Sequence, residues 1–371
     1  MAAPNVLGII YSNVYDDCIS ELTSIRTMGS VPFAGRYRLI DFVLSGMVNG
    51  GIVKVGISTK ANYQSLMDHV GSGKAWDLSR KRDGMTILPP FNLASTGGVY
   101  KSRIEALKGM LSYISESGKD YVVLSDCNVV CNIDYAEFVD EHIKSGADIS
   151  IAYKRGISPA LHNTMNFEFD GERITKVTLT DKASEGAVNY SLNIIVMSRI
   201  LIERLIEEAV THSYVYFERD IIANKASTLN IRGHKIESYA KTIDSLQSYY
   251  DISLELLSGE YRDLFEKDKP VYTKVRDDMP AIYGVCSKAS GSLIGDGCVI
   301  KGTVENCILF RGVYVAEGAV VKNSIIMQDS YISTNAKVNC AILDKGVVIT
   351  PNRVISGAET YPLYIGKKIT I

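Results

Sequence analysis

The residues that could do chemistry are spread along the chain, and few of them have the spacing of a familiar site. Cys127 and Cys131 are the closest pair among the 7 cysteines, but their spacing is not C-x-x-C and no second pair with suitable spacing follows. Structural zinc sites need four such ligands. The two thiols are therefore predicted to be small buried groups at the end of a strand, and no metal is expected on them.

Two charged clusters bear on whether the chain could bind phosphate groups or other anions. Asp16 and Asp17 follow an apolar run that ends at Tyr11. They fit a surface turn, and beside a triphosphate they would be repulsive, since like charges 4 Å apart interact with ~4 kcal/mol at an effective dielectric of 20. The basic run Arg80-Lys81-Arg82 lies in a polar stretch. It fits either a solvated loop or a contact to an anionic effector, and a charge-reversal variant would separate the two.

Composition places these residues in an ordinary globular protein. The 371 residues predict roughly two to three domains. Hydrophobic residues make up 46% and charged residues 22%, which allows a sizeable core. A net charge of −2 argues against nucleic acid or an anionic membrane as partner. No apolar stretch approaches the roughly 18–20 residues that span a bilayer, the start of the chain lacks a signal-peptide pattern, and the odd, scattered cysteines fit a cytoplasmic location.

The elements that would position these residues change character along the chain. Apolar runs of strand length (7–11, 53–57, 121–124 and 149–153) alternate with segments of helical spacing, such as 103–114 and 136–143. Parallel strands need such crossovers, so an open, mostly parallel α/β sheet is predicted over residues 1–257, ending in a helix at 245–257. Ligands of such sheets bind in the crevice at the carboxyl ends of the strands. A charged connector is predicted over residues 258–280.

Residues 281–371 carry a hexapeptide pattern. Small aliphatics recur about every six residues with glycine, asparagine or aspartate between them, as in I-G-D-G-C-V at 294–299. This period is typical of a parallel β-helix, whose coils bury their aliphatics only against one another. An antiparallel sheet would need hairpin turns, which are not obvious. A hexapeptide acyltransferase would generally use a histidine base, but all 5 histidines lie at or before His234.

One long motif resembles a known family. Residues 31–45 read V-P-F-A-G-R-Y-R-L-I-D-F-V-L-S. This stretch closely resembles the V-P-F-G-G-K-Y-R-I-I-D-F-x-L-S block of bacterial glucose-1-phosphate adenylyltransferases (ADP-glucose pyrophosphorylases), and N-G-G-I at 49–52, F-E-R-D-I-I at 217–222 and the β-helix support it. The resemblance covers nearly the whole chain and implies a nucleotidyltransferase α/β domain followed by a left-handed β-helix, usually in a tetramer. The implied reaction joins ATP and glucose 1-phosphate to give ADP-glucose and pyrophosphate for glycogen synthesis.

The groups that handle the triphosphate in this family are changed here. The family's L-A-G-G-x-G-x-R-L phrase, in which glycines let backbone N–H groups approach the phosphates, corresponds to Y-S-N-V-Y-D-D-C-I at residues 11–19. All three glycines are missing, and Cys18 stands at the arginine position. In the family's R-A-K-P-A phrase Met28 replaces the lysine, and a thioether cannot neutralise phosphate charge.

The two aspartates that hold magnesium in the family are also replaced. Anchored on Asp134, the first position becomes Asn128, and anchored on Leu246 the second becomes Thr242. Neutral groups should hold magnesium far more weakly than carboxylates, so no strongly bound cofactor is expected. Asp126 lies two residues from Asn128, and Asp244 lies two residues from Thr242. In an extended segment, residues two apart point to the same face, so these aspartates could act as displaced ligands.

The sugar end of the implied site is partly retained. Asp181 and Lys182 stand where the family has E-K, whose lysine contacts the sugar phosphate; that charge-assisted bond could persist, or Lys182 could be solvated. The remaining candidates for the sugar-phosphate pocket are Ser191, Asn193 and Tyr100, in altered versions of the family phrases. In the first motif, Arg36 and Arg38 are candidate effector-binding residues.

The sequence keeps the scaffold of the family but lacks its catalytic groups, and in this respect it is similar to the D-type companion subunits of the family. The resemblance implies a regulatory, catalytically weak or inactive subunit that assembles with a catalytic subunit in a heterotetramer, in which the partner uses magnesium. Sugar phosphates or nucleotides are candidate effectors. Two alternatives stay open: an active glucose-1-phosphate adenylyltransferase that uses the displaced carboxylates, and a purely structural protein.

Overall fold

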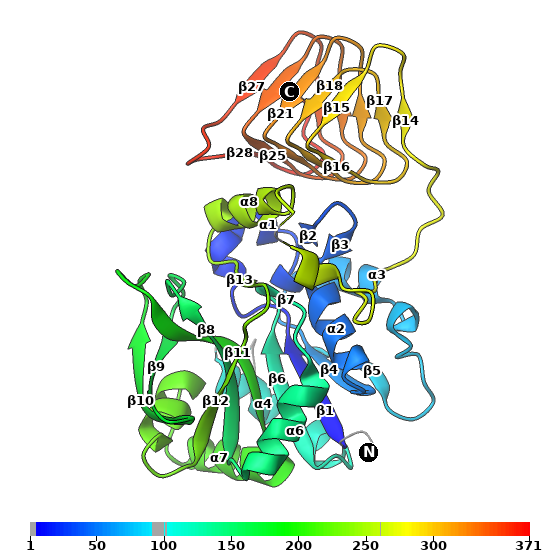
Figure 1. The fold of residues 1–371 in the computed structure, drawn as a ribbon. Helices are drawn as coiled ribbons and strands as arrows, with labels where there is room; N and C mark the ends of the chain where they lie inside the picture. The colour runs from blue at the N-terminus through cyan, green and yellow to red at the C-terminus, as the bar shows by residue number, and fades with distance from the viewer. Residues whose placement is uncertain (1–4, 91–99, 101, 260) are drawn as a thin grey trace.

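The computed structural model describes residues 5–90, 100, 102–259 and 261–371, which form an α/β domain followed by a β-helix (Figure 1). The first domain is built on a nine-stranded sheet with the order β5-β4-β1-β6-β11-β8-β12-β10-β9. Its strands are β1 (Val6–Tyr11), β4 (Lys54–Ser58), β5 (Gly84–Leu88), β6 (Tyr121–Asp126), β8 (Ile149–Gly156), β9 (Thr164–Asp170), β10 (Arg173–Thr180), β11 (Val188–Ser198) and β12 (Ile231–Lys235).

Most strands of this sheet point the same way, as predicted. β1 pairs in parallel with β4 and β6, β4 with β5, and β8 with β12. β11 is antiparallel to β6 and β8, and β10 is antiparallel to β12 and β9, so only β10 and β11 are reversed. The apolar runs expected to be strands are β1, β4, β6 and β8. The predicted fold class is confirmed.

Helices cover both faces of the sheet because side chains alternate along each strand. Val6 and Ile10 of β1 share a core with α2 (Leu39–Asn49), α6 (Tyr135–Ser145) and α8 (Leu246–Glu255). Leu7 and Ile9 face α4 (Arg103–Gly109), α5 (Leu111–Ser115) and α7 (Arg199–Thr211). The helix expected over 103–114 is present as two pieces that meet at Met110. Within the described residues, no helix is both long enough and apolar enough to cross a membrane.

Short elements surround the carboxyl ends of β1 and β6. They are η1 (Asp16–Ile19), α1 (Ser20–Thr23), η2 (Met28–Ser30), the hairpin β2 (Pro32–Phe33) with β3 (Tyr37–Arg38), β7 (Val129–Cys131), β13 (Ala240–Thr242) and the π-helical turn η4 (Phe217–Ala223). The other short pieces of this domain and of the connector are α3 (Gln64–Val70), η3 (Lys74–Trp76) and η5 (Arg262–Phe265). Several of these pieces form the candidate site together with residues of β6, β11 and α4.

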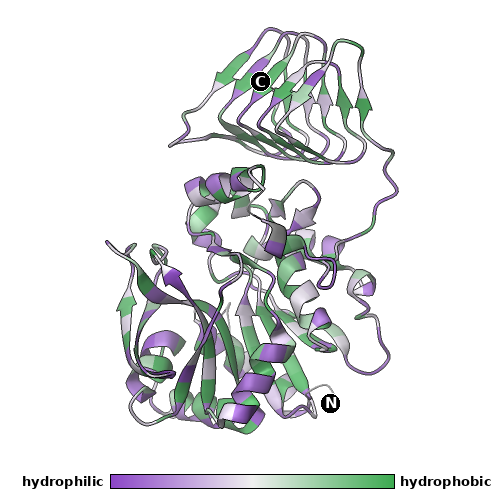
Figure 2. Ribbon diagram, viewed as in Figure 1, coloured by the Kyte–Doolittle hydropathy of each residue, from purple (hydrophilic) through white to green (hydrophobic). Residues whose placement is uncertain are grey.

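The second domain is a left-handed parallel β-helix made of three five-stranded sheets. The first sheet contains β14 (Ile282–Tyr283), β17 (Val299–Ile300), β20 (Tyr314–Val315), β23 (Tyr331–Ile332) and β26 (Val348–Ile349). The second contains β15 (Lys288–Ser290), β18 (Thr303–Glu305), β21 (Val320–Lys322), β24 (Lys337–Asn339) and β27 (Val354–Ser356). The third contains β16 (Leu293–Ile294), β19 (Ile308–Leu309), β22 (Ile325–Ile326), β25 (Ala341–Leu343) and β28 (Leu363–Ile365). Figure 2 shows hydrophobic residues repeating along these coils and along the central sheet.

The third sheet of the β-helix faces the α/β domain (Figure 1). Ile308, Ile325 and Ile342 lie in register on neighbouring coils and belong to the core that also contains α2 and α8. Their neighbours Leu309, Ile326 and Leu343 point the other way, into the interior of the β-helix. The two domains therefore share one continuous apolar core.

Candidate functional site

The loop after β1, residues 12–19, occupies the position of the expected phosphate cradle and is held together by its own polar side chains. Ser12 Oγ donates to the carbonyl oxygen of Ser58 at 2.7 Å. Asn13 Oδ1 accepts from the backbone N–H of Lys60 at 2.8 Å. We call this segment the β1–α1 loop. Its polar groups are engaged with the neighbouring β4 end rather than directed outward.

Asp16 fixes the β1–α1 loop to the segment that follows α1. One carboxylate oxygen accepts from Asn13 Nδ2 at 2.6 Å, and the other accepts from the backbone N–H of Met28 at 2.7 Å. Burial raises the pKa of Asp16 to about 7, although the hydrogen bonds from Asn13 and Met28 oppose the shift. Asp16 is thus a partly buried structural link, whereas Asp17 is exposed.

Cys18 and Met28 stand where the family has an arginine and a lysine, and neither supplies a positive charge to the loop. Met28 is buried in the apolar core. Cys18 is partly buried, and burial is the main cause that raises the pKa of its thiol to about 11, with nearby carboxylates adding to the effect. Both residues are therefore neutral near pH 7, so they cannot balance a phosphate charge.

The two positions expected to have lost a magnesium ligand lie side by side. β7 and β13 pair antiparallel, the N–H of Ile243 donates to the carbonyl oxygen of Asn128 at 2.8 Å, and Asn128 Nδ2 donates to the carbonyl oxygen of Ile243 at 3.3 Å. Asn128 Oδ1 and Thr242 Oγ1 are buried oxygens without a hydrogen-bond partner. The fold thus preserves the neighbourhood of the two positions, but it presents two neutral oxygens there.

Asp126, the first candidate for a displaced ligand, is already paired with a buried cation. Arg103 donates from Nη1 and Nη2 to the two oxygens of Asp126 at 3.0 and 2.9 Å, and from Nε to Glu218 at 3.0 Å. The Arg103 and Asp126 side chains are 3% and 1% exposed. Burial alone would lower the pKa of Arg103, but Asp126 and Glu218 raise it well above its ordinary value. Both oxygens of Asp126 are therefore committed to a guanidinium group.

Arg103 also stacks on the ring of Tyr11, with its guanidinium carbon 4.7 Å from the ring centroid. Sequence reasoning missed Arg103, because its partners Asp126 and Glu218 lie 23 and 115 residues away in the chain. Asp244, the second candidate for a displaced ligand, accepts from the N–H of Ala160 and from Ser245 Oγ, each at 3.0 Å. Magnesium favours several anionic oxygens, so this set of residues does not fit the ion.

The residues expected at the sugar end do not all lie together. Asn193 Nδ2 donates to the hydroxyl of Tyr15 in the β1–α1 loop at 2.7 Å, and Ser191 Oγ accepts from the N–H of Asn193 at 2.9 Å. Tyr100 shares a hydrogen bond of 3.2 Å with Ser58 at the end of β4. These three candidate residues therefore line the inner side of the site, around the β1–α1 loop.

Asp181 and Lys182 lie on the exposed turn between β10 and β11. Asp181 accepts from the N–H of Asn163 at 2.8 Å, and its carboxylate lies 3.1 Å from Nδ1 of His162. A role for Lys182 in holding a sugar phosphate stays a prediction.

A second candidate site lies between the domains, in a strongly basic cavity of about 330 Å³. The expected effector residues Arg36 and Arg38 line it. The other residues of its wall are His69, Lys274, Arg276, Arg311, Gln328, Asp329 and Lys345. Six of these side chains are cationic and one is a carboxylate, which leaves an excess of about five positive charges with neutral histidine. Such a wall is suited to a multiply charged anion.

The cations of this basic cavity are only partly balanced by the protein. Burial, then the neighbouring Arg38 and Arg26, lower the pKa of Lys345 to about 7. Burial likewise lowers the pKa of Arg38 to about 10. Arg311 Nε lacks a hydrogen-bond partner and lies 3.8 Å from Asp296. An anion in the cavity would supply the missing negative charge.

The basic run at residues 80–82 is separate from this cavity. Arg80, Lys81 and Arg82 are exposed before β5, and Arg80 is paired with Asp77. None of the three lines the basic cavity. The solvated-loop interpretation and the effector interpretation of this run both remain predictions.

Comparison with known proteins agrees with both domains. Residues 19–167 match the nucleotidyl transferase family, and residues 281–360 match the GlmU-like C-terminal hexapeptide family. The chain is 35% identical to the glycogen biosynthesis protein GlgD of Bacillus subtilis (strain 168), covering 98% of this chain and 96% of the relative. It is 36% identical to GlgD of Geobacillus stearothermophilus, covering 85% and 82%.

The glucose-1-phosphate adenylyltransferase of Fervidobacterium nodosum (strain ATCC 35602 / DSM 5306 / Rt17-B1) is 31% identical, with 93% of this chain and 84% of that protein covered. With 98% and 93% of this chain covered, the matches to the Bacillus subtilis and Fervidobacterium nodosum proteins extend through both domains. The chain belongs to the glucose-1-phosphate adenylyltransferase family, within the group of glycogen biosynthesis proteins named GlgD.

Proposed function

We propose that this protein is a regulatory subunit of glucose-1-phosphate adenylyltransferase in the cytoplasm, with little or no nucleotidyl transfer of its own. It would assemble with a catalytic subunit in a heterotetramer and change how that subunit responds to effectors. The observation that carries the proposal is the pairing of Arg103 with Asp126 and Glu218, which commits these carboxylates of the candidate site to a cation of the protein itself.

The electrostatics of the site support low activity. Phosphoryl transfer depends on cations that neutralise the developing charge, and one such arginine is worth about 10³–10⁵ in rate. Here Cys18 and Met28 are neutral, Asn128 and Thr242 replace the magnesium ligands, and Asp126 is engaged by Arg103. This arrangement also argues against an active enzyme that uses displaced carboxylates.

The basic cavity supports a regulatory role. It combines Arg36 and Arg38 of the α/β domain with Arg311 and Lys345 of the β-helix. A sugar phosphate or nucleotide bound there would contact both domains at once and could stabilise one relative arrangement of them. We therefore assign the effector contact of this subunit to the basic cavity.

The proposal is tested by comparing three preparations: this chain alone, the catalytic subunit alone, and the two co-expressed and purified together. ADP-glucose formation from ATP and glucose 1-phosphate is measured with magnesium. This chain alone should be at least about 10³-fold slower than the mixed enzyme, and the mixed enzyme should differ from the catalytic subunit in its effector response. Turnover by this chain alone at about 10 s⁻¹, an ordinary enzyme rate, would establish the active-enzyme alternative.

A variant of the mixed enzyme tests the regulatory part separately. Arg38→Ala in this chain should weaken activation or inhibition by a sugar bisphosphate while co-purification with the catalytic subunit is unchanged. Arg80→Ala is the matched control, because it removes an exposed arginine that does not line the basic cavity. Equal effector responses for wild type and Arg38→Ala would remove the cavity from the proposal.

A further inference from the structure

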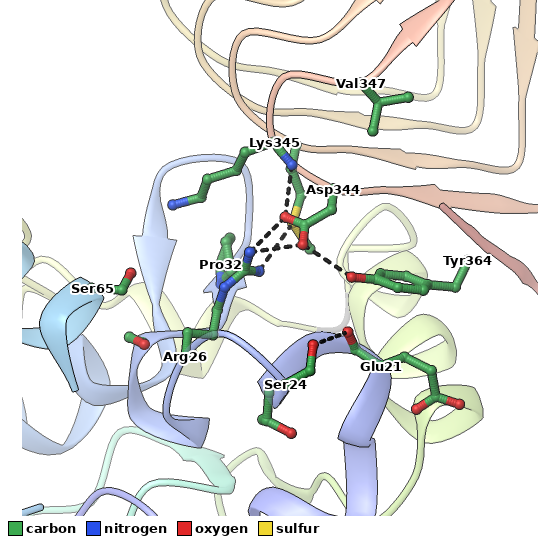
Figure 3. Close-up of polar contacts among 12 residues, drawn as sticks. Glu21, Ser24, Arg26, Pro32, Ser65, Asp344, Lys345, Val347 and Tyr364 are labelled. Carbon is green, nitrogen blue, oxygen red and sulfur yellow. Dashed lines mark hydrogen bonds and ion pairs between the residues drawn. The ribbon is translucent and has the colours of Figure 1, made fainter. Parts of the chain in front are cut away.

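Arg26 and Asp344 form a fully buried ion pair across the boundary between the two domains (Figure 3). Arg26 Nη2 lies 2.8 and 2.7 Å from the two carboxylate oxygens, and the side chains are 2% and 0% exposed. Buried ion pairs are often replaceable by apolar residues without loss of stability. Stability alone therefore does not account for a charged pair in this apolar boundary.

On the β-helix side, the pair adjoins the basic cavity directly. Asp344 also accepts from the hydroxyl of Tyr364 at 3.0 Å and from the backbone N–H of Lys345 at 2.7 Å. The side chain of Lys345 extends away from the Asp344 carboxylate (Figure 3) and lines the cavity. Asp344 thus pairs with the buried cation Arg26 and directly precedes Lys345, a cation of the cavity wall.

On the α/β side, Arg26 begins the segment that holds the β1–α1 loop. The N–H of Met28 donates to Asp16, and the N–H of Gly29 donates to the carbonyl oxygen of Ser12 at 3.1 Å. Gly29 is packed so closely that an added Cβ would lie 3.1 Å from the sulfur of Cys127. A displacement of Arg26 would therefore be passed to Ser12 and Asp16 of the loop, because the segment has little room to absorb it.

We propose that the Arg26–Asp344 pair transmits anion binding in the basic cavity to the β1–α1 loop. Lys345 and Arg38 line the cavity and lie close enough to repel the buried guanidinium of Arg26. An anion that pairs with them reduces this repulsion, so Arg26 is held more firmly against Asp344, and residues 26–30 hold Asp16 and Ser12 more firmly. Arg26 and Asp344 act as positioning residues, since neither contacts the anion. The inference rests on the proposed effector cavity and adds the route by which its occupation is sensed.

The test measures anion binding and the response of the loop separately, on the full chain. Sulfate is the probe because its charge is constant near neutral pH, and sodium chloride keeps the ionic strength equal. Calorimetry gives the sulfate affinity, and amide hydrogen exchange is followed in residues 12–30. In the wild type, sulfate should slow exchange in this segment by about fivefold, the lower end of ordinary coupling between sites.

Two variants isolate the pair. The neutral double variant Arg26→Met/Asp344→Asn avoids an unpaired buried charge, and it should still bind sulfate but lose the change in exchange. Tyr364→Phe is the matched control, since it removes another hydrogen bond to Asp344 while the ion pair remains, and its response should resemble that of the wild type.

The outcomes distinguish the two proposals. Sulfate binding with a wild-type exchange response in the double variant would overturn the role of the pair and leave the cavity intact. Sulfate binding to the wild type without any change of amide exchange in residues 12–30 would also overturn the role of the pair and leave the cavity intact. Failure of the wild type to bind sulfate or a sugar bisphosphate would overturn the effector cavity and the transmission route together.

Discussion

Arg103 donates to both carboxylate oxygens of Asp126, at 3.0 and 2.9 Å, at the place where the resemblance in sequence implies a triphosphate and a metal ion. The guanidinium comes from the start of α4 and the carboxylate from the last residue of β6. Internal pairing of this kind replaces an external ligand by a side chain. One buried arginine thereby serves as counter-ion to two carboxylates, Asp126 and Glu218, when nothing is bound.

Removal of this cation should be strongly destabilising. Arg103→Ala leaves Asp126 and Glu218 buried without a counter-ion, and breaking a buried pair costs about 3–5 kcal/mol. Urea unfolding of the isolated chain measures the loss. Arg199→Ala, which removes a partly exposed arginine paired with Glu203, should cost clearly less, because that pair keeps contact with water. Equal costs for the two variants would contradict an essential role for the buried pair.

Restoration of two carboxylates should restore metal binding but not catalysis. In Asn128→Asp/Thr242→Asp the new carboxylates lie on the paired segments β7–β13, so magnesium should raise the melting temperature of the variant and leave that of the wild type nearly unchanged. ADP-glucose formation should stay near background, because the β1–α1 loop still lacks a phosphate cradle. Sodium chloride at matched ionic strength is the control. A magnesium-dependent rise in the melting temperature of the wild type would show that its site still binds the ion.

Lys345 should make stability depend on pH. Its pKa is lowered from 10.5 to about 7, mainly by burial. Between these values the unfolded chain binds more protons than the folded chain, so the free energy of unfolding rises with pH in this window. Lys345→Gln should therefore be more stable than wild type at pH 6, and this advantage should shrink by pH 9.

The control for this pH experiment is Lys182→Gln, an exposed lysine outside the cavity. Denaturant unfolding at each pH gives the difference between variant and wild type. An advantage of Lys345→Gln that stays constant from pH 6 to pH 9 would show that its ammonium group titrates normally.

The sequence was sufficient for the architecture and for part of the candidate site. Period-six aliphatics predicted the β-helix, and the family phrases placed Asn128 and Thr242 at equivalent positions, which the pairing of β7 with β13 brings together. Local patterns of this kind are visible because each repeat or phrase is short. The same patterns could not predict a partner for Arg103, since Glu218 lies 115 residues away.

The basic cavity was predicted only in part for a related reason. Arg36 and Arg38 lie in a recognisable motif, but Lys274, Arg311 and Lys345 come from the connector and from two separate coils of the β-helix. Single lysines and arginines in such segments usually indicate solvent exposure. Only the packing of the third β-helix sheet against α2 and α8 assembles them into one wall.

That packing also governs how the chain can be divided. Ile308, Ile325 and Ile342 complete a core whose other half belongs to the α/β domain, so a chain truncated near residue 280 would expose a wide apolar surface to water. Neither domain is therefore expected to fold stably as a separate fragment. Heat or denaturant should unfold both domains in a single cooperative step, so the two architectures form one cooperative unit.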